Sequence, residues 1–407
     1  MQIRTLLLGL FLTMGPLSFV YGQETVSFMC YNLLNFPDQA PNRADTLKKI
    51  IQHKQPDVFL VCELSTSFGR SIITSQAMNV DGVTYYGAAA WNDGYDSDNM
   101  LWYNTNKLGL KSQTQIQTNL RDISEYVLYY KSTDIATNPD TIFITVYGVH
   151  LKAGSTQSNE EDREDEAQIL KNRLALTNPE NVLVGGDFNM KTYLEPAYAK
   201  LTVGGTVPLF DPINRAGSWN NNANFADIHT QSTRTTSLNG GSTGGLDDRF
   251  DMWFVGSQVK DGTDGVQYIS GSYEAVGNDA NHFNDDINDM PNTAVSPDIA
   301  NALYYMSDHL PVYMELLVGR NVSVPEISRE KWSVTRFEDN YLHVFTESET
   351  EDVSLTLIDL NGNIILNEAH AQFKEGFLAL PSDLSKGIYI LDVQTPTSRI
   401  PLKVGLF

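Results

Sequence analysis

Short runs of apolar, β-favouring residues recur along most of the chain and are separated by polar loops. Runs of about four to eight such residues between turn residues predict β-strands. The predicted strands of the longer, N-terminal part are residues 26–31, 58–62, 100–103, 141–149, 182–184, 250–255 and 311–317. Helical spacing of apolar residues predicts helices over residues 44–53 and 162–174. Strands interspersed with helices and long loops indicate an α/β or α+β layered domain.

The N-terminal residues have the pattern of a secretory signal peptide. Arg4 supplies the positive start, residues 6–12 the apolar segment, and Gly22 ends a small-residue cleavage site. The alternative is a buried N-terminal helix. No stretch is apolar for long enough to span a bilayer, so we predict no transmembrane segment. We therefore expect residues 1–22 to be a signal peptide and the mature protein to be secreted.

The two cysteines, Cys30 and Cys62, both fall in predicted strands. An exported chain could pair them in a disulfide. If Asn32 and Glu63 face one site, strand alternation puts Cys30 on that face and Cys62 on the opposite face. We therefore predict two buried free thiols.

The formal net charge is −22, which repels a polyanion. This charge argues against a protein that holds nucleic acid tightly through phosphate contacts. It argues less against an enzyme that first recruits a divalent cation, because the ion inverts the sign of the local field. The net charge therefore argues against a nucleic-acid substrate, but it does not argue against cation-assisted catalysis.

Several predicted strands end in residues that suit metal-assisted phosphodiester hydrolysis. That reaction needs a cation on the phosphate, a positioned water and a protonated or metal-bound leaving oxygen. Hard cations prefer carboxylate oxygens, and Glu63 ends the run 58–62. Asp187 and Asn189 follow another run, and alternation aims both the same way with Phe188 in the core. Taken alone, Glu63 could form an ion pair, and the Asp187 motif could be a turn.

Two histidines have polar neighbours in the sequence. His150 ends a long predicted strand, and Asp308 and His309 open the last strand of the large domain. Asp308 can bind a metal beside Glu63. Asp251 can orient a histidine through its ring N–H and raise its basicity. A single histidine more often has a structural role than a catalytic one. The prediction of an active site therefore depends on all of these residues taken together.

These residues together resemble the endonuclease/exonuclease/phosphatase superfamily, which includes pancreatic-type deoxyribonucleases, abasic-site endonucleases, neutral sphingomyelinases and inositol polyphosphate phosphatases. The resemblance covers residues 25–317. The matching motifs, in order, are Tyr31-Asn32-Leu33-Leu34-Asn35, Cys62-Glu63, Gly148-Val149-His150-Leu151, Gly186-Asp187-Phe188-Asn189, Arg249-Phe250-Asp251 and Ser307-Asp308-His309. The resemblance implies a two-sheet α/β sandwich within residues 23–319, with the site where loops of the two sheets meet.

The resemblance also implies a metal site. Glu63 and Asp308 are expected to hold Mg²⁺, with Mn²⁺ or Ca²⁺ as alternatives, and Asn32 belongs to the same network. The family often has Gln where this chain has Cys62. Because we expect Cys62 to face away from the site, we expect little effect from this difference.

The remaining family positions imply the chemical steps. Asp187 is expected to aim the water, while Asn189 and His309 grip the phosphate. Asp251 orients His309, which is also the candidate general base. His150 is expected to be the general acid that protonates the leaving oxygen.

The candidate substrate is nucleic acid: DNA, with RNA as an extension. Four residues around the Gly- and Ser-rich loop 237–245 could contact a strand by charge and stacking. They are Arg215, Trp219, Arg234 and Arg249, and their structural alternative is ordinary loop and core residues. The other substrate class is lipid head groups or inositol phosphates, although no exposed apolar hairpin for a membrane is evident. A non-catalytic binding protein on the same fold should have lost ligands, and here every position is filled.

The C-terminal part changes in composition, with a predicted linker over residues 320–331 and alternating strands and turns over 332–407. Asn361-Gly362 between β-rich runs predicts a hairpin, and the whole predicts a small all-β sandwich without a catalytic constellation. Residues 357–363 and 384–390, with Lys403-Val404, resemble the sorting domain of type IX secretion cargo. This resemblance implies a Gram-negative source, recognition by the type IX machinery and passage across the outer membrane to the cell surface or medium. The alternative is an accessory substrate-binding module.

Overall fold

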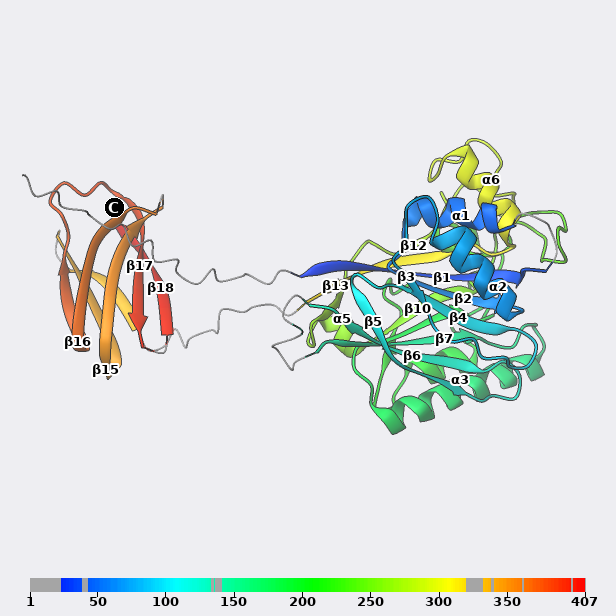
Figure 1. Ribbon diagram of the computed structural model, residues 1–407, viewed down its shortest axis with the longest axis horizontal. Coiled ribbons are helices and arrows are strands. Elements are labelled where there is room, and N and C mark those ends of the chain that lie inside the picture. Colours follow the sequence, from blue (N-terminus) through cyan, green and yellow to red (C-terminus); the bar gives the residue numbers. More distant parts are fainter. Residues whose placement is uncertain are drawn as a thin grey trace, which may run out of the picture. The chain divides into compact units, whose positions relative to one another are not determined.

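The computed structural model describes residues 23–38, 43–132, 135, 141–319, 332–337, 340–360, 362–396 and 398–406. They form two compact units, residues 23–319 and residues 332–406, which Figure 1 colours from blue to yellow and from orange to red. The predicted signal peptide and the predicted linker lie outside the described residues. Among the helices described, none is long and apolar enough to cross a membrane.

The first sheet of the larger unit has the strand order β11-β13-β1-β2-β4-β3, with β12 paired to β13. Its strands are β1 (Glu24–Phe36), β2 (Val58–Leu64), β3 (Tyr86–Ala88), β4 (Asp98–Asn104), β11 (Val266–Tyr268), β12 (Glu274–Ala275) and β13 (Val312–Val318). Strand β1 is parallel to β2 and antiparallel to β13. The end of β1 therefore lies beside the end of β2 and the start of β13.

The second sheet has the order β5-β6-β7-β8-β10-β9. Its strands are β5 (Leu108–Ile116), β6 (Ile123–Tyr130), β7 (Phe143–His150), β8 (Val182–Asp187), β9 (Leu209–Phe210) and β10 (Asp251–Gly256). Strands β7 and β8 are parallel, and β10 is antiparallel to β8. The end of β8 therefore lies beside the end of β7 and the start of β10, as in the first sheet.

The two sheets pack face to face on one apolar core. Trp253 of β10 meets Phe28 of β1 edge to face, with ring centroids 6.1 Å apart. Ile144 and Val146 of β7 belong to the same buried cluster. The opposite face of the second sheet buries residues such as Phe254 in a separate cluster. Each central strand of the second sheet is thus apolar on both faces, which accounts for its near-continuous apolar runs.

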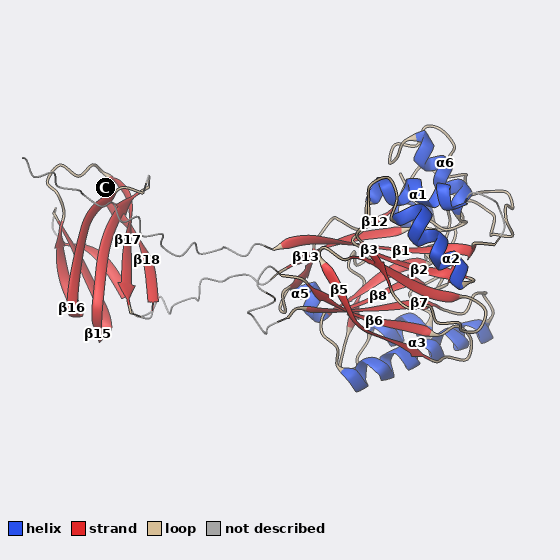
Figure 2. Ribbon diagram, viewed as in Figure 1, coloured by secondary structure: helices blue, strands red, loops and turns tan. Residues whose placement is uncertain are grey.

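Helices cover the outer faces of the sandwich, as Figure 2 shows. Their bounds are α1 (Arg43–Lys54), α2 (Ser67–Ile72), the π-helical η1 (Ile73–Met78), α3 (Gln157–Thr177), α4 (Pro196–Thr202), the 3₁₀-helical η2 (Ala223–Ile228), α5 (Ser257–Asp261) and α6 (Pro297–Met306). Helix α1 buries Leu47 and Ile50, which belong to the same apolar cluster as the first sheet. Helix α3 begins with a capping box formed by Thr156 and Asn159, which satisfies two orphan N-terminal groups.

The predicted fold class, a two-sheet α/β sandwich followed by an all-β unit, is confirmed. The predicted strands and helices of the larger unit correspond to β1, β2, β4, β7, β8, β10, β13, α1 and α3. Strands β5 and β6 and helix α6 were not predicted. Strand β5 is exposed over much of its length, with Lys111 and Ser112 both on the surface, so it lacks the apolar pattern of a buried strand.

The smaller unit is one antiparallel sheet of five strands. They are β14 (Trp332–Phe337), β15 (Tyr341–Asp359), β16 (Ile364–Ala379), β17 (Gly387–Thr395) and β18 (Ser398–Leu406). The predicted hairpin is the β15–β16 turn, where the backbone N–H of Asp359 donates to the carbonyl of Asn363. Strand β15 pairs with β14 near its start and with β17 near its end. The five strands enclose one apolar cluster, in which Trp332 stacks on Phe373, in agreement with the predicted small all-β sandwich.

Candidate active site

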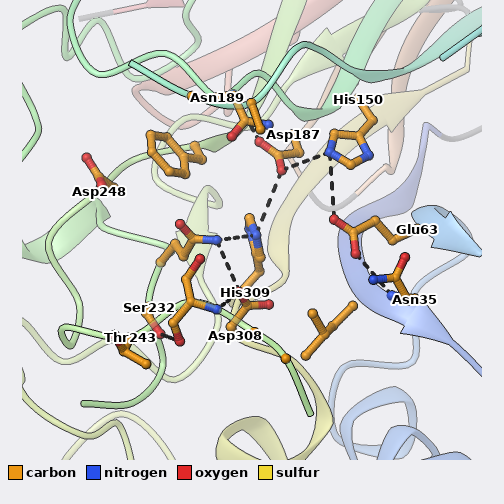
Figure 3. Close-up of a pocket in the computed structure, with 18 of the residues that line it drawn as sticks. Asn35, Glu63, His150, Asp187, Asn189, Ser232, Thr243, Asp248, Asp308 and His309 are labelled. Atoms are coloured by element: carbon orange, nitrogen blue, oxygen red, sulfur yellow. Dashed lines mark hydrogen bonds and ion pairs between the residues drawn. The ribbon is translucent and has the colours of Figure 1, made fainter. Parts of the chain in front are cut away.

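Strand ends from both sheets meet at one edge of the larger unit. Asn32 and Glu63 lie near the ends of β1 and β2, and His150 and Asp187 end β7 and β8. Asp251 begins β10 and pairs with Asp187 in register. The eight residues predicted for the site lie within or directly behind a pocket of about 460 Å³ at this edge (Figure 3). They are Asn32, Glu63, His150, Asp187, Asn189, Asp251, Asp308 and His309.

Asn32 joins the two sheets inside the site. Its fully buried side-chain amide donates to Oε1 of Glu63 at 2.9 Å and to Oδ2 of Asp187 at 3.1 Å. The first partner belongs to the first sheet and the second to the second sheet. The predicted place of Asn32 in the carboxylate network is consistent with these bonds, which hold two carboxylates at one amide.

Glu63 turns into the pocket because its backbone adopts a left-handed conformation, with φ of 57°. Its Oε2 accepts the backbone N–H of Asn35 at 3.0 Å. Burial raises the pKa of Glu63, and the carboxylate of Asp308 adds to the increase. A cation at this carboxylate would relieve both effects.

The same backbone turn overturns the prediction for Cys62. Cys62 is paired in register with Asn32 on the parallel strand β1, so both side chains point to the same face of the sheet. The prediction that Cys62 faces away from the site was wrong, because strict alternation does not hold at Glu63. The predicted outcome for the thiols is confirmed: Cys30 and Cys62 are free and buried.

His150 is buried between two carboxylates. Its Nε2 lies 3.7 Å from Oε1 of Glu63 and 3.6 Å from Oδ2 of Asp187, as the dashed lines of Figure 3 show. Its Nδ1 is buried and has no hydrogen-bond partner in the described part of the chain. Burial, with Arg121 and His309 nearby, lowers the pKa of His150 well below its usual value.

His309 and Asp251 form a buried hydrogen-bonded pair. Nδ1 of His309 lies 2.7 Å from Oδ2 of Asp251, which is the orienting contact expected from the sequence. Its Nε2 lies 3.8 Å from Oδ2 of Asp187. Burial opposes the charged ring, but the carboxylates of Asp251, Asp308 and Asp187 outweigh it and raise the pKa of His309 well above its usual value. The two histidines of the site therefore have opposite shifts.

Asp187 and Asn189 are arranged by a local turn. The backbone N–H of Asn189, which has φ of 53°, donates to Oδ1 of Asp187 at 3.0 Å. The side-chain amide of Asn189 donates to the carbonyl of Leu151 at 3.1 Å. Phe188 is buried against Phe254, as predicted. Burial, with Asp251 and Glu63 nearby, raises the pKa of Asp187 to about 7.

Asp308 is held by the Gly- and Ser-rich loop 237–245 and by Gln231. Its Oδ2 accepts the backbone N–H of Ser242 at 2.7 Å and the side-chain amide of Gln231 at 3.3 Å. Residues 240–243 of the Gly-rich loop line the pocket. Gln231 also meets Nε2 of His309 at 2.6 Å. The sequence offered no signal for Gln231, which lies in a segment without apolar periodicity.

The carboxylates of the pocket fit a divalent cation. Oδ1 of Asp308 and Oδ1 of Asp251 are buried without a hydrogen-bond partner among the described residues, although buried carboxylate oxygens normally have one. Hard divalent cations take such oxygens as ligands.

Within the described residues, the compact ligand group is Asp187, Asp251 and His309, whose atoms lie within 4.8 Å of one another. This group differs from the predicted pair, Glu63 and Asp308. In it, Asp251 already binds the ring of His309, so we retain the predicted pair as the cation ligands to be tested.

Three of the four predicted contacts to a nucleic-acid strand were wrong. Trp219, Arg234 and Arg249 are fully buried, and a buried side chain cannot stack on or pair with a strand. Arg249 donates to both carboxylate oxygens of Asp211, at 2.8 and 3.0 Å. Arg215, which also lies outside the pocket lining, forms a two-bond ion pair with Asp227. Trp219, Arg234 and Arg249 therefore have structural roles, whereas a strand contact of the partly exposed Arg215 stays a prediction.

Other charged residues line the pocket and were not predicted. They are Arg121, Lys191, Asp247 and Asp248. Arg121 is paired with Asp96 at 2.9 Å, and the charge of Lys191 acts on Asp247 and Asp248. In Figure 3, Asp248 and Glu63 lie on opposite sides of the pocket, with Asp187 and His309 between them.

No family model matches this sequence, and no curated protein matches it. Several solved structures are similar. An endonuclease/exonuclease/phosphatase family protein from Bacteroides thetaiotaomicron is 15% identical with a TM-score of 0.46, over 74% of this chain and 100% of that chain. TDP2 from D. rerio, complexed with single-strand DNA product, is 14% identical with a TM-score of 0.47, over 72% and 98%.

A mannosyl-6-phosphatase from Bacteroides thetaiotaomicron is also similar: 14% identical with a TM-score of 0.44, over 72% of this chain and 99% of that chain. Identities and scores this low carry neither activity nor family membership to this chain. The activity must therefore be argued from the pocket itself.

Proposed function

We propose that the larger unit is a divalent-cation-dependent phosphoester hydrolase, acting on phosphodiesters. The observation that carries this proposal is the convergence of three buried carboxylates, one half-buried carboxylate and two buried histidines from both sheets on one pocket. The carboxylates are Glu63, Asp187, Asp251 and Asp308, and no arginine or lysine forms an ion pair with any of them within the described residues. Phosphoester hydrolysis requires this combination of cation ligands and proton-transfer groups.

The cation, held by Glu63 and Asp308, would neutralise phosphate charge and polarise the phosphorus centre. Asp187, with its pKa raised to about 7, can accept a proton from the attacking water near neutral pH. His309, whose pKa is raised, suits the phosphate-gripping role more than that of general base.

His150 does not suit the general-acid role expected from the sequence. A general acid must be protonated before the leaving oxygen departs, but burial lowers the pKa of His150 well below its usual value. A neutral His150 can still donate one N–H to a phosphate oxygen. We therefore propose that His150 binds phosphate or the leaving oxygen as a neutral donor, in place of the acid role expected from the sequence.

The substrate proposed from the sequence is DNA, with RNA as an extension. The burial of three of the four predicted strand contacts weakens this proposal, and so does the acidic pocket wall at Asp247 and Asp248. A small phosphodiester, such as a lipid head group or an inositol phosphate ester, would present fewer phosphates to that wall. Both classes share the central phosphoester chemistry.

A substrate panel on the purified mature chain tests the proposal. Plasmid DNA, RNA, sphingomyelin and inositol polyphosphates are incubated with Mg²⁺, Mn²⁺, Ca²⁺ or EDTA, with the Asp187→Asn variant as the matched inactive control. We expect cation-dependent hydrolysis of at least one member that the variant lacks. Cleavage that persists in EDTA, or no cleavage of any phosphoester, would reject the proposed function. Intact plasmid beside cleaved lipid would reject only the nuclease substrate.

We further propose that the protein is exported and that the smaller unit directs its passage through the type IX machinery. The supports are the sequence pattern of residues 1–22 and the motifs of the C-terminal 75 or so residues, in a unit that folds around its own apolar core. Intact-mass analysis of the extracellular protein tests both. Retention of residues 1–22 in that protein, or unchanged export after deletion of residues 332–407, would contradict the proposal.

A further inference from the structure

A buried polar segment, residues 230–234, connects the two strand starts that carry the His309–Asp251 pair. Gln231 forms antiparallel bridges with Asp248, just before β10, and with His309, just before β13. The backbone N–H of Asp248 donates to the carbonyl of Gln231 at 2.9 Å, and that of Leu310 donates to the carbonyl of Thr230 at 2.7 Å. The segment therefore fixes the start of the second-sheet strand relative to the start of the first-sheet strand.

The side chain of Gln231 continues this connection into the pocket. Its amide meets Nε2 of His309 at 2.6 Å and Oδ2 of Asp308 at 3.3 Å. Because Asp251 holds Nδ1 at 2.7 Å, both ring nitrogens of His309 are engaged. The half-buried Gln231 lines the pocket, so a phosphate oxygen arriving at Nε2 would have to replace it.

The amide nitrogen of Gln231 has two N–H groups, so it can donate one to Nε2 of His309 and the other to Oδ2 of Asp308. A carboxylate at this position could only accept, and an alkyl group could do neither.

We propose that Gln231 is a positioning residue of the hydrolysis proposed above. It holds the imidazole of His309 in one orientation and gives up its contact to the incoming phosphate. The inference rests on the proposed function for its kinetic consequence. The contact between Gln231 and His309 stands on the geometry alone.

A substitution at Gln231 should leave the fold intact, because other groups hold the segment. Oγ1 of Thr230 accepts the backbone N–H of Asp251 at 3.1 Å, and Oγ1 of Thr233 donates to the carbonyl of Ser307 at 2.7 Å. Together with the backbone bridges, these bonds remain after truncation of the Gln231 side chain.

The test compares Gln231→Ala and the near-isosteric Gln231→Glu with the wild type. Gln168→Ala, on the exposed face of α3, is the matched control. One readout is kcat and KM for bis(para-nitrophenyl) phosphate with Mg²⁺. The other is the affinity for inorganic phosphate, measured by calorimetry on the same proteins.

For Gln231→Ala we expect kcat to fall on the order of tenfold, while phosphate binds about two- to threefold more tightly because its competitor is gone. For Gln231→Glu we expect kcat to fall and both KM and the phosphate dissociation constant to rise, because the added charge repels phosphate. The Gln168→Ala control should match the wild type. These opposite changes in phosphate affinity would not arise from a purely structural role.

Wild-type values of kcat and phosphate affinity in Gln231→Ala would overturn the proposal, as would weaker phosphate binding in both variants. If the wild type hydrolyses no phosphoester, the proposed function fails, but the phosphate titration still decides whether Gln231 competes at His309. If Gln231→Ala unfolds, Gln231→Glu provides the same comparison, and unchanged phosphate affinity in that variant overturns the proposal.

Discussion

Buried charges occur in two kinds of surroundings in the larger unit. Some buried charges away from the pocket are matched by an opposite charge: Arg163 lies 2.6 Å from Glu195, and Arg249 binds Asp211 through two hydrogen bonds. In the pocket the buried acids outnumber the cations, and Asp308 has a carboxylate oxygen without a partner in the described structure. Burying a charge is costly unless it is paired. A matched pair is consistent with a structural role, whereas unmatched acids indicate a site that needs a cation.

The largest effect should follow from changing the unmatched acids and their histidine. We expect Asp187→Asn and His309→Ala to lower kcat on the order of a thousandfold or more, because each removes a proton-transfer or phosphate-binding group. Asp187→Asn should fold at least as well as the wild type, because its carboxylate is buried beside other acids. Steady-state kinetics and thermal unfolding check both, with the exposed Asp81→Asn as the control. Near-wild-type turnover in either variant would remove that residue from the mechanism.

A matched pair should respond in the opposite way. Arg249→Met leaves the buried carboxylate of Asp211 unpaired, and we expect the free energy of unfolding to fall by about 3–5 kcal/mol. Turnover per folded molecule should not change. Arg215→Met removes the half-exposed pair with Asp227 and should cost about 0–1 kcal/mol.

Denaturant unfolding with activity assays measures the contrast between these two arginines. Equal losses of stability in the two variants would contradict the distinction between buried and exposed ion pairs. Loss of turnover in folded Arg249→Met would restore a substrate role to that residue.

The smallest effect concerns the cysteines beneath the site. Cys30 and Cys62 are free thiols, and burial raises the pKa of each well above its usual value. We expect no reaction with a thiol reagent in the native protein, two reactive thiols after unfolding, and no shift of the unfolding temperature on adding reductant. A disulfide detected by mass spectrometry would contradict this expectation.

The sequence predicted much of the fold and most of the site because the apolar runs that predict the strands also end at the site residues. Glu63 and Asp187 each follow an apolar run, and the carboxyl ends of buried strands meet at a common edge. The positions of the buried arginines could not be read in this way. Arg249 looked like a substrate contact until Asp211, 38 residues earlier in the chain, proved to be its partner.

The remaining errors come from local backbone and from tertiary contacts. Strand alternation placed Cys62 on the wrong face because it could not anticipate the positive φ of Glu63. Gln231 was missed because its segment is polar and yet buried, and that burial depends on partners contributed by β10 and β13. Neither the positive φ of Glu63 nor the burial of the Gln231 segment produces a periodic pattern of apolar residues in the sequence.

Cation binding is the most direct test of the central claim. Mn²⁺ is titrated by calorimetry into the wild type and the Glu63→Gln, Asp308→Asn and Asp251→Asn variants. The expected result is one site in the wild type, weakened on the order of tenfold or more by the first two changes and retained in Asp251→Asn. Wild-type affinity in both Glu63→Gln and Asp308→Asn, or no binding to the wild-type protein, would contradict the claim that the unmatched acids of this pocket form a cation site.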